Sequence, residues 1–169
     1  GDSHAPTGGA FGAYLFGIGA TEMLGVLVTG EIWLKVPETI LVEWTGRLGD
    51  GLAAKDMMLH AIGRLGMDGG RYGAVEYAGA AVQALSMQER MTLANMTAEL
   101  GGQTGLVAPD AVTRAWLAGV GVNDIDVAPW HTDSGAALGA HHRFDATALA
   151  PQVAAPHSPA NADDADRYG

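Results

Sequence analysis

The 169-residue sequence contains no cysteine, and this absence excludes several kinds of site. Without thiols the chain forms no disulfide and supplies no thiolate ligand to a metal or an iron–sulfur cluster. Basic residues are also few: nine Lys and Arg stand against 19 Asp and Glu, which gives a net charge of −10 at pH 7. Because the basic residues are dispersed, no basic patch is available to bind the phosphates of a nucleic acid.

Long uninterrupted apolar runs are missing as well. The most apolar stretch, residues 10–30, contains Glu22 and several glycines, and falls short of the roughly 18 apolar residues that suggest a membrane span. The chain begins at Gly1 and shows no basic segment followed by an apolar one, so no signal peptide is expected. Charged residues make up only 17% of the chain, against about a quarter in ordinary soluble domains. This deficit suggests that a partner, or further parts of the same chain, cover much of the surface.

The residues that are present predict alternating strands and helices, which is typical of a layered α/β domain. β-Branched and aromatic content predicts strands at 39–44, 74–78 and 104–108. Apolar spacing and helix formers predict helices at 52–65, 86–100 and 110–117, and Gly or Pro residues mark where elements end. The helix that starts after Ser86 has a capping box, in which Glu89 reaches back to the cap.

The two ends of the chain are less regular. Residues 10–29 are expected to pack as a helix with small residues at close contacts, and residues 31–36 to form a short strand or an exit segment that ends at Pro37. Residues 129–169 are rich in proline and alanine, and are expected to form an extended, partly mobile segment that leads out of the domain.

The first nine residues, GDSHAPTGG, place a carboxylate, a hydroxyl and an imidazole side by side. Asp2, Ser3 and His4 cannot form a nucleophilic triad with one another, because triads depend on geometry in the fold rather than on adjacency in sequence. Asp, Ser, Gly and Pro are common turn residues. The alternative to a functional site at these residues is therefore a polar turn that caps the helix expected from about residue 10.

A second candidate is the pair Asn95 and Glu99, which are four residues apart and would share one face of a helix. Their neighbours are mostly apolar or small, so the pair is expected in buried surroundings, where a carboxylate needs a partner or takes up a proton. The alternative is a pair that hydrogen-bonds along an exposed helix face.

Three further polar sites are weaker candidates. His60 is interpreted as a half-buried packing residue. The pair His141 and His142, in a loop of Gly and Ala, is interpreted as solvated, with adventitious metal binding as the alternative. Asp56 is expected on a solvated helix face beside Lys55.

Several long stretches, in order and over essentially the whole chain, carry a resemblance to a known family: GDSHAPTGG, GIGATEM, GEIWLKVPETI, AAKDMMLH, VEYAG, QALSMQERMTLANMTAELGGQTGLVAPD and LAPQVAAPHSPANA. They resemble the aconitase superfamily, and within it the large-subunit branch of 3-isopropylmalate dehydratase and homoaconitase. Composition and periodicity agree with this resemblance but do not show it.

The resemblance implies a three-layer α/β/α fold and an internal fragment of a longer protein. Residues 1–37 would be the C-terminal part of a first α/β domain, 38–128 a second domain, and 129–169 a linker toward a third. The cluster cysteines and further active-site histidines of the family lie outside such a fragment. We therefore expect the fragment alone to bind no cluster and to be inactive.

The implied activity is that of a cytoplasmic hydro-lyase, which isomerises a hydroxy di- or tricarboxylic acid by dehydration and rehydration. The first choice of substrate is 3-isopropylmalate, in leucine biosynthesis; homoaconitate, citrate and dimethylmalate are alternatives. The family uses a [4Fe–4S] cluster with one iron free of protein ligands as a Lewis acid. The implied partners are the rest of the large subunit and a small subunit with a swivelling domain. A hypothesis of another class is a non-catalytic binding or assembly module.

By the same resemblance, Asp2 and His4 would orient and protonate the departing hydroxyl, and Ser3 would hydrogen-bond a substrate carboxylate. Glu99 would accept a hydrogen bond from water at the cluster iron, and Asn95 would lie beside the cluster. Ala5 departs from the family, which usually has Thr there, and so removes one hydroxyl next to the site. Retention of these buried polar groups argues against a purely structural module, because they cost stability.

Overall fold

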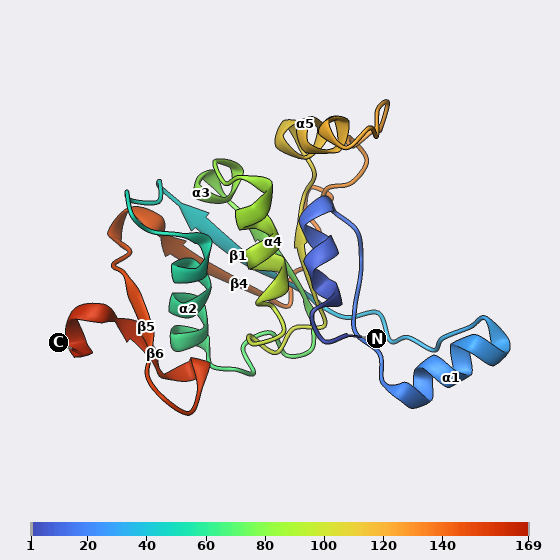
Figure 1. Ribbon diagram of the computed structural model, residues 1–169, viewed down its shortest axis with the longest axis horizontal. Helices are drawn as coiled ribbons and strands as arrows, with labels where there is room; N and C mark the ends of the chain where they lie inside the picture. The colour runs from blue at the N-terminus through green and yellow to red at the C-terminus, as the bar shows by residue number, and fades with distance from the viewer. Residues whose placement is uncertain (1, 169) are drawn as a thin grey trace.

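Four parallel strands form the centre of the computed structural model, which describes residues 2–168 (Figure 1). Their order in the sheet is β3-β2-β1-β4. The strands are β1 (Thr39–Thr45), β2 (Ala74–Ala78), β3 (Thr104–Val107) and β4 (Ala140–Asp145). The first three strands confirm the sequence prediction, and the parallel sheet with flanking helices confirms the α/β class.

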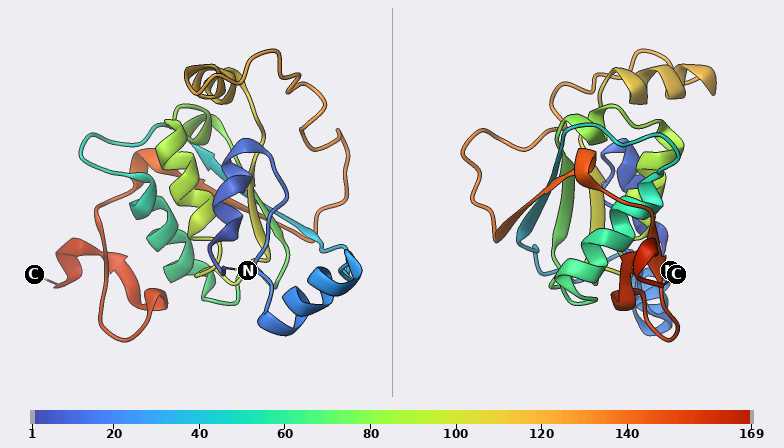
Figure 2. Two further views of the ribbon diagram at one scale, coloured as in Figure 1. Left: turned by 45° about the vertical axis from the view of Figure 1, so that its right-hand side comes forward. Right: turned by 90° about the vertical axis from the view of Figure 1, so that its left-hand side faces the viewer.

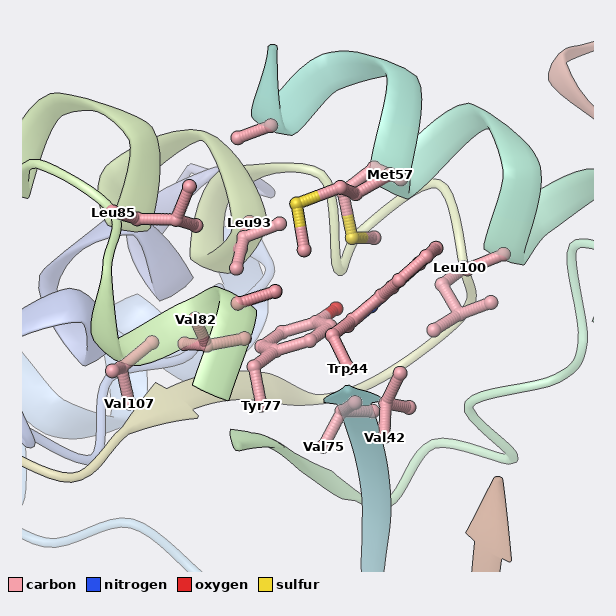
Figure 3. Close-up of a cluster of buried hydrophobic side chains, with 14 of the residues drawn as sticks. Val42, Trp44, Met57, Val75, Tyr77, Val82, Leu85, Leu93, Leu100 and Val107 are labelled. Atoms are coloured by element: carbon pink, nitrogen blue, oxygen red, sulfur yellow. The ribbon is translucent and has the colours of Figure 1, made fainter. Parts of the chain in front are cut away.

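One face of this sheet packs against α2 (Ala54–Leu65), α3 (Ala80–Gln83) and α4 (Met87–Asn95). Along β1 the buried residues alternate, so that Ile40, Val42 and Trp44 all point into this core. Figure 3 shows Trp44 and Tyr77 beneath Met57 and Leu93, which come from α2 and α4. The alternation is the period of a strand with one well-buried face.

The opposite face carries the connection from β3 to β4. The chain moves in one direction from β1 to β2 to β3, then returns past β1 to the other edge of the sheet. Parallel crossovers are right-handed, so a reversal of direction places the connection on the other face. Residues 120–139, which follow α5 (Ala111–Gly119), run there (Figure 2). Thr132 donates a hydrogen bond to Glu76, which alternates with the core-facing Val75 and Tyr77.

The expected helix at 10–29 is two separate elements. A 3₁₀ helix, η1 (Ala5–Phe11), ends where Gly12 adopts φ 79°, and α1 (Ala20–Thr29) begins only after an extended segment. The single-helix prediction is therefore wrong. α1 has no buried residue and projects from the body of the molecule (Figure 1). Residues 31–36 form no strand and are an exit segment.

The extended segment expected at 129–169 instead contains a strand of the main sheet. β4 pairs with β1 from Ile40 opposite Ala140 to Thr45 opposite Asp145. Its residues alternate between half-buried and exposed because only one side of β4 packs on the core. Short elements follow it, and these are η2 (Ala146–Ala148), β5 (Gln152–Ala154), η3 (Pro159–Asn161), β6 (Ala162–Asp164) and η4 (Ala165–Tyr168), with β5 and β6 paired antiparallel. That residues 129–169 also lead toward a third domain stays a prediction.

Asp56 joins this C-terminal part to α2. Its Oδ2 accepts a hydrogen bond from the backbone N–H of Ala53 at 2.9 Å, and its Oδ1 accepts one from the N–H of Gln152 at 2.9 Å. The expectation of a solvated carboxylate is wrong, because both oxygens hold backbone groups that would otherwise lack partners.

The remaining histidines have structural surroundings. His60 is half-buried against the rings of Trp44 and Phe144, with centroids 6.0 Å and 5.5 Å away, which confirms its packing role. His141 is exposed, as expected, but His142 is half-buried, and both lie on β4 rather than in a loop. The Nε2 of His141 lies 2.9 Å from Glu43 Oε2. Among residues 2–168, no helix is both long and apolar enough to cross a membrane.

Candidate active site

The site is formed where the end of α4 meets the N-terminal turn. The capping box at the start of α4 is present as predicted, with Ser86 and Glu89 bonded to each other's backbone N–H. The helix ends at Asn95, however, and residues 96–101 form a series of turns. The prediction of a helix to Leu100 is wrong, and Glu99 therefore lies on a turn beyond α4.

Asp2, Ser3 and His4 form a polar turn that leads into η1. The Oδ1 of Asp2 accepts hydrogen bonds from the His4 N–H at 3.3 Å and from the Ser3 hydroxyl at 3.4 Å. Ser3 Oγ lies 3.1 Å from His4 Nδ1. His4 occupies the N-cap position of η1, but its side chain makes no capping hydrogen bond. The alternative of a helix-capping turn is therefore wrong for this side chain, whose imidazole points elsewhere.

The imidazole of His4 reaches Glu99. Its Nε2 lies 3.1 Å from Glu99 Oε1, although the two residues are 95 positions apart in sequence. A second bridge runs parallel to the first: Asn95 Nδ2 donates to Thr7 Oγ1 at 2.9 Å, and the Thr7 hydroxyl donates to the carbonyl of His4 at 2.7 Å. Asn95 and Glu99 thus both contact the N-terminal segment, and do not pair along an exposed helix face.

Thr7 is the polar residue of this arrangement that sequence reasoning missed. It stands three residues after His4 in the GDSHAPTGG stretch, which is the spacing at which a hydroxyl reaches back to a backbone carbonyl in a 3₁₀ turn. That spacing could have identified it.

The contact with Glu99 raises the pKa of His4 above its usual value. The hydrogen bond to the Glu99 carboxylate is the largest cause; partial burial opposes it, and the charges of Glu99 and Asp2 add to it. The two side chains are partly open, at 39% exposed for His4 and 29% for Glu99. Glu99 Oε2 is nevertheless buried and accepts no hydrogen bond from the described residues. An unpaired buried carboxylate oxygen is costly, so this atom is a candidate contact for a ligand.

Ser3 also lines a cavity of about 420 Å³. The other lining residues are Gly17, Ile18, Tyr72, Ala98, Gly101, Gly102 and Gln103. The segment around Gly17 lies directly on the N-terminal turn, because a Cβ at this position would be 2.5 Å from the carbonyl oxygen of Asp2. The cavity is large enough for a small organic acid.

The α/β fold agrees with the comparison with known proteins. Residues 1–167 match the sequence model of the aconitase family (aconitate hydratase), and the chain belongs to that family. It is 46% identical over 160 residues to the 3-isopropylmalate dehydratase large subunit of Nitratidesulfovibrio vulgaris. It is 44% identical over 161 residues to large subunit 1 of the same enzyme from Methanopyrus kandleri, and 42% identical over 160 residues to the chloroplastic large subunit of Arabidopsis thaliana.

These matches cover 95% of this chain but only 38%, 38% and 31% of the three relatives. The chain thus spans well under half the length of the curated relatives that it matches. The sequence contains no cysteine. In the part of the chain that the structure describes, no group of three or more His, Asp or Glu side chains is arranged to hold a metal ion.

Proposed function

We propose that the protein to which this chain belongs is an iron–sulfur hydro-lyase that isomerises 3-isopropylmalate by dehydration and rehydration. The names of the relatives support this substrate. The observation that supports the chemistry is the contact between His4 and Glu99, which forms across 95 residues of sequence beside the Asp2–Ser3 turn. Homoaconitate, citrate and dimethylmalate are the alternative substrates.

We propose that His4 gives a proton to the departing hydroxyl from Nδ1, the nitrogen that faces Ser3 Oγ at 3.1 Å, while Nε2 stays bonded to Glu99. The raised pKa of His4 favours the protonated imidazole, which is the form that a general acid needs. Glu99 stabilises that form and fixes the ring through Nε2. Asp2, whose Oδ1 lies 3.8 Å from His4 Nδ1, orients the ring from the other side. When the hydroxyl is added back, the same imidazole accepts the proton.

We propose that Ser3 turns its single hydroxyl proton from Asp2 Oδ1, which lies 3.4 Å away, to a substrate carboxylate. It lines the cavity, and its oxygen lies at the centre of the turn that also holds His4. A hydroxyl in this position provides one hydrogen bond and little charge. We therefore expect cationic groups elsewhere in the full-length protein to bind the remaining carboxylate charge.

The described residues are suited to face an iron–sulfur cluster but not to ligate it. A [4Fe–4S] cluster with an open iron would supply Lewis-acid activation of the substrate hydroxyl. Its thiolate ligands must come from outside this chain, which has no cysteine. Glu99 provides a buried carboxylate oxygen without a hydrogen-bond partner among residues 2–168. We propose that Glu99 and the neighbouring Asn95 face the cluster. The proposed partners are the missing parts of the large subunit and a small subunit.

The test is turnover by the full-length protein, expressed from the reading frame that contains this chain, together with its small subunit. The enzyme is purified without oxygen and offered 3-isopropylmalate, homoaconitate, citrate and dimethylmalate, while absorbance of the dehydrated alkene is followed. We expect 3-isopropylmalate to give the highest kcat/KM. A higher value for another acid would reassign the substrate. No turnover of any of them, with the cluster present, would contradict the hydro-lyase proposal and favour a binding module.

A further inference from the structure

The turn that carries Glu99 is weakly held by its own backbone. Three of its internal hydrogen bonds are long: Thr97 N–H to Ala94 carbonyl and Ala98 N–H to Asn95 carbonyl at 3.4 Å, and Leu100 N–H to Met96 carbonyl at 3.3 Å. Hydrogen bonds of this length are weak. Contacts with other elements therefore hold residues 96–101. At the far end, the carbonyls of Leu100 and Gly101 accept from the N–H groups of Gly70 and Tyr72 at 2.8 Å, and the part nearer to Asn95 is held through contacts of Thr97.

Thr97 supplies those contacts from inside the core. Its side chain is fully buried, and its hydroxyl donates to the carbonyl of Leu93 at 3.1 Å. The same oxygen lies 2.8 Å from the hydroxyl of Tyr77. Because the single Thr97 proton goes to Leu93, the Tyr77 hydroxyl is the donor in the second bond. The carbonyl of Thr97 accepts from the N–H of Gly102 at 3.0 Å, so the side chain and the backbone are both anchored.

Tyr77 is fixed as a donor by its surroundings. It belongs to β2, and its ring lies in the core beside Trp44 (Figure 3). Burial raises the pKa of this phenol, and the nearby charge of Glu99 raises it further. Tyr77 therefore stays protonated, and its hydroxyl ties the turn directly to the sheet.

Glu99 needs such an anchor. One oxygen contacts His4, while the other is buried without a hydrogen bond from the described residues. A carboxylate in that position gains solvation by moving outward, and the long bonds of its own turn do not prevent this. We propose that the Tyr77–Thr97 hydrogen bond is the positioning device that holds turn 96–101, and with it the Glu99 carboxylate, against His4. The catalytic meaning of this device rests on the proposed function, but its geometry does not.

The test is a histidine titration by NMR in the 169-residue chain itself. Asp2 on its own turn and Glu99 on the facing turn are the charged groups that raise the pKa of His4. E99Q defines the titration of His4 without the carboxylate. We expect T97V, which keeps the shape of the side chain but removes its hydroxyl, and Y77F, which keeps the ring, to lower the pKa of His4 toward that of E99Q. T97S, which retains the hydroxyl, should titrate like the unaltered chain.

The matched control is T113V, which also removes a hydroxyl from a fully buried threonine but lies in α5. Its hydroxyl accepts from the Asp110 N–H, so the change should destabilise the chain without moving the His4 titration. If T97V does not fold, Y77F decides the question by itself. A His4 titration unchanged in Y77F and T97V would overturn the proposal, and would leave the proposed hydro-lyase function untouched. Conversely, an inactive full-length enzyme would contradict the function and not the positioning device.

Discussion

The ion pair between Arg90 and Asp110 joins α4 to the start of α5, and breaking it should destabilise the chain strongly. The Arg90 side chain is fully buried, and its two terminal nitrogens lie 2.8 Å and 2.7 Å from the two oxygens of Asp110. Asp110 also caps α5, since its Oδ1 accepts from the N–H of Val112 at 2.8 Å. Burial acts to raise the pKa of the Asp110 carboxyl, but the guanidinium and the capping bonds outweigh it, so the pKa is lowered.

The expected cost follows from what each substitution leaves behind. Removing one partner of a buried pair costs about 3–5 kcal/mol, because an uncompensated charge remains inside the protein. D110N keeps a side-chain oxygen that can cap α5. Because the Asp110 side chain is 36% exposed, we expect D110N to lower the free energy of unfolding by about 3 kcal/mol, the lower end of that range. D110A also loses the cap, which is worth about 1 kcal/mol more.

Urea unfolding followed by circular dichroism measures this difference. The matched control is D163N, because Asp163 pairs with Arg167, whose side chain is 62% exposed, and an exposed pair contributes less than about 1 kcal/mol. Because the folded pKa of Asp110 is lowered, the pair stabilises the chain above the unfolded pKa, and this stabilisation disappears as pH falls through the folded pKa. If D110N cost no more than D163N near neutral pH, the reasoning about Arg90 would be refuted.

Two further predictions concern packing and pH. G9A should lower the free energy of unfolding by about 2 kcal/mol and weaken the His4–Glu99 contact, because a Cβ on Gly9 would lie 1.7 Å from the carbonyl oxygen of Gly105 and push η1 off β3. Urea unfolding measures the first effect and the His4 titration the second. Unchanged values in both would contradict the close approach of η1 to β3. Burial lowers the pKa of His60 from its usual 6.5, so the stability that depends on a neutral His60 should be lost as pH falls from about 6.5 toward the folded pKa. H60Q should remove this slope when unfolding is measured at several pH values, and a slope that persists would assign it to another group. His4 contributes in the opposite sense, because its raised pKa gives stability that is lost as pH rises through the folded value.

The elements that could be predicted from sequence are those with strong local signals. β1 is rich in β-branched and aromatic residues, and α4 has a capping box whose two hydrogen bonds form as expected. Local chemistry specifies such features regardless of the rest of the chain.

The incorrect predictions for β4 and for the end of α4 concern features that depend on tertiary contacts. β4 reads AHHRFD and lacks apolar alternation, because its outward face carries His141 and Arg143, which pair with Glu43 on β1. α4 ends at Asn95, and in the turn that follows, Thr97 contacts Tyr77 on β2. Propensity over residues 96–100 favours continued helix, and the core overrides it.

The candidate site was predicted as two separate motifs, and the structure brings them together. Nothing in local sequence pairs His4 with Glu99, because their contact requires η1 to lie beside α4 and β3. Spacing placed Asn95 and Glu99 on one face of one helix, whereas Glu99 reaches the site from a turn. The roles assigned to Asp2, Ser3, His4, Asn95 and Glu99 stay proposals.

We propose that His4 and Glu99 act together in proton transfer during dehydration. The most direct measurement is kcat of the full-length enzyme for 3-isopropylmalate in the unaltered protein and in E99Q and H4Q, with cluster content matched by iron analysis. We expect each variant to lose kcat by about 100-fold or more, and the double variant to lose little beyond the single ones. Variants that keep a near-normal kcat at equal cluster content would contradict this proposal.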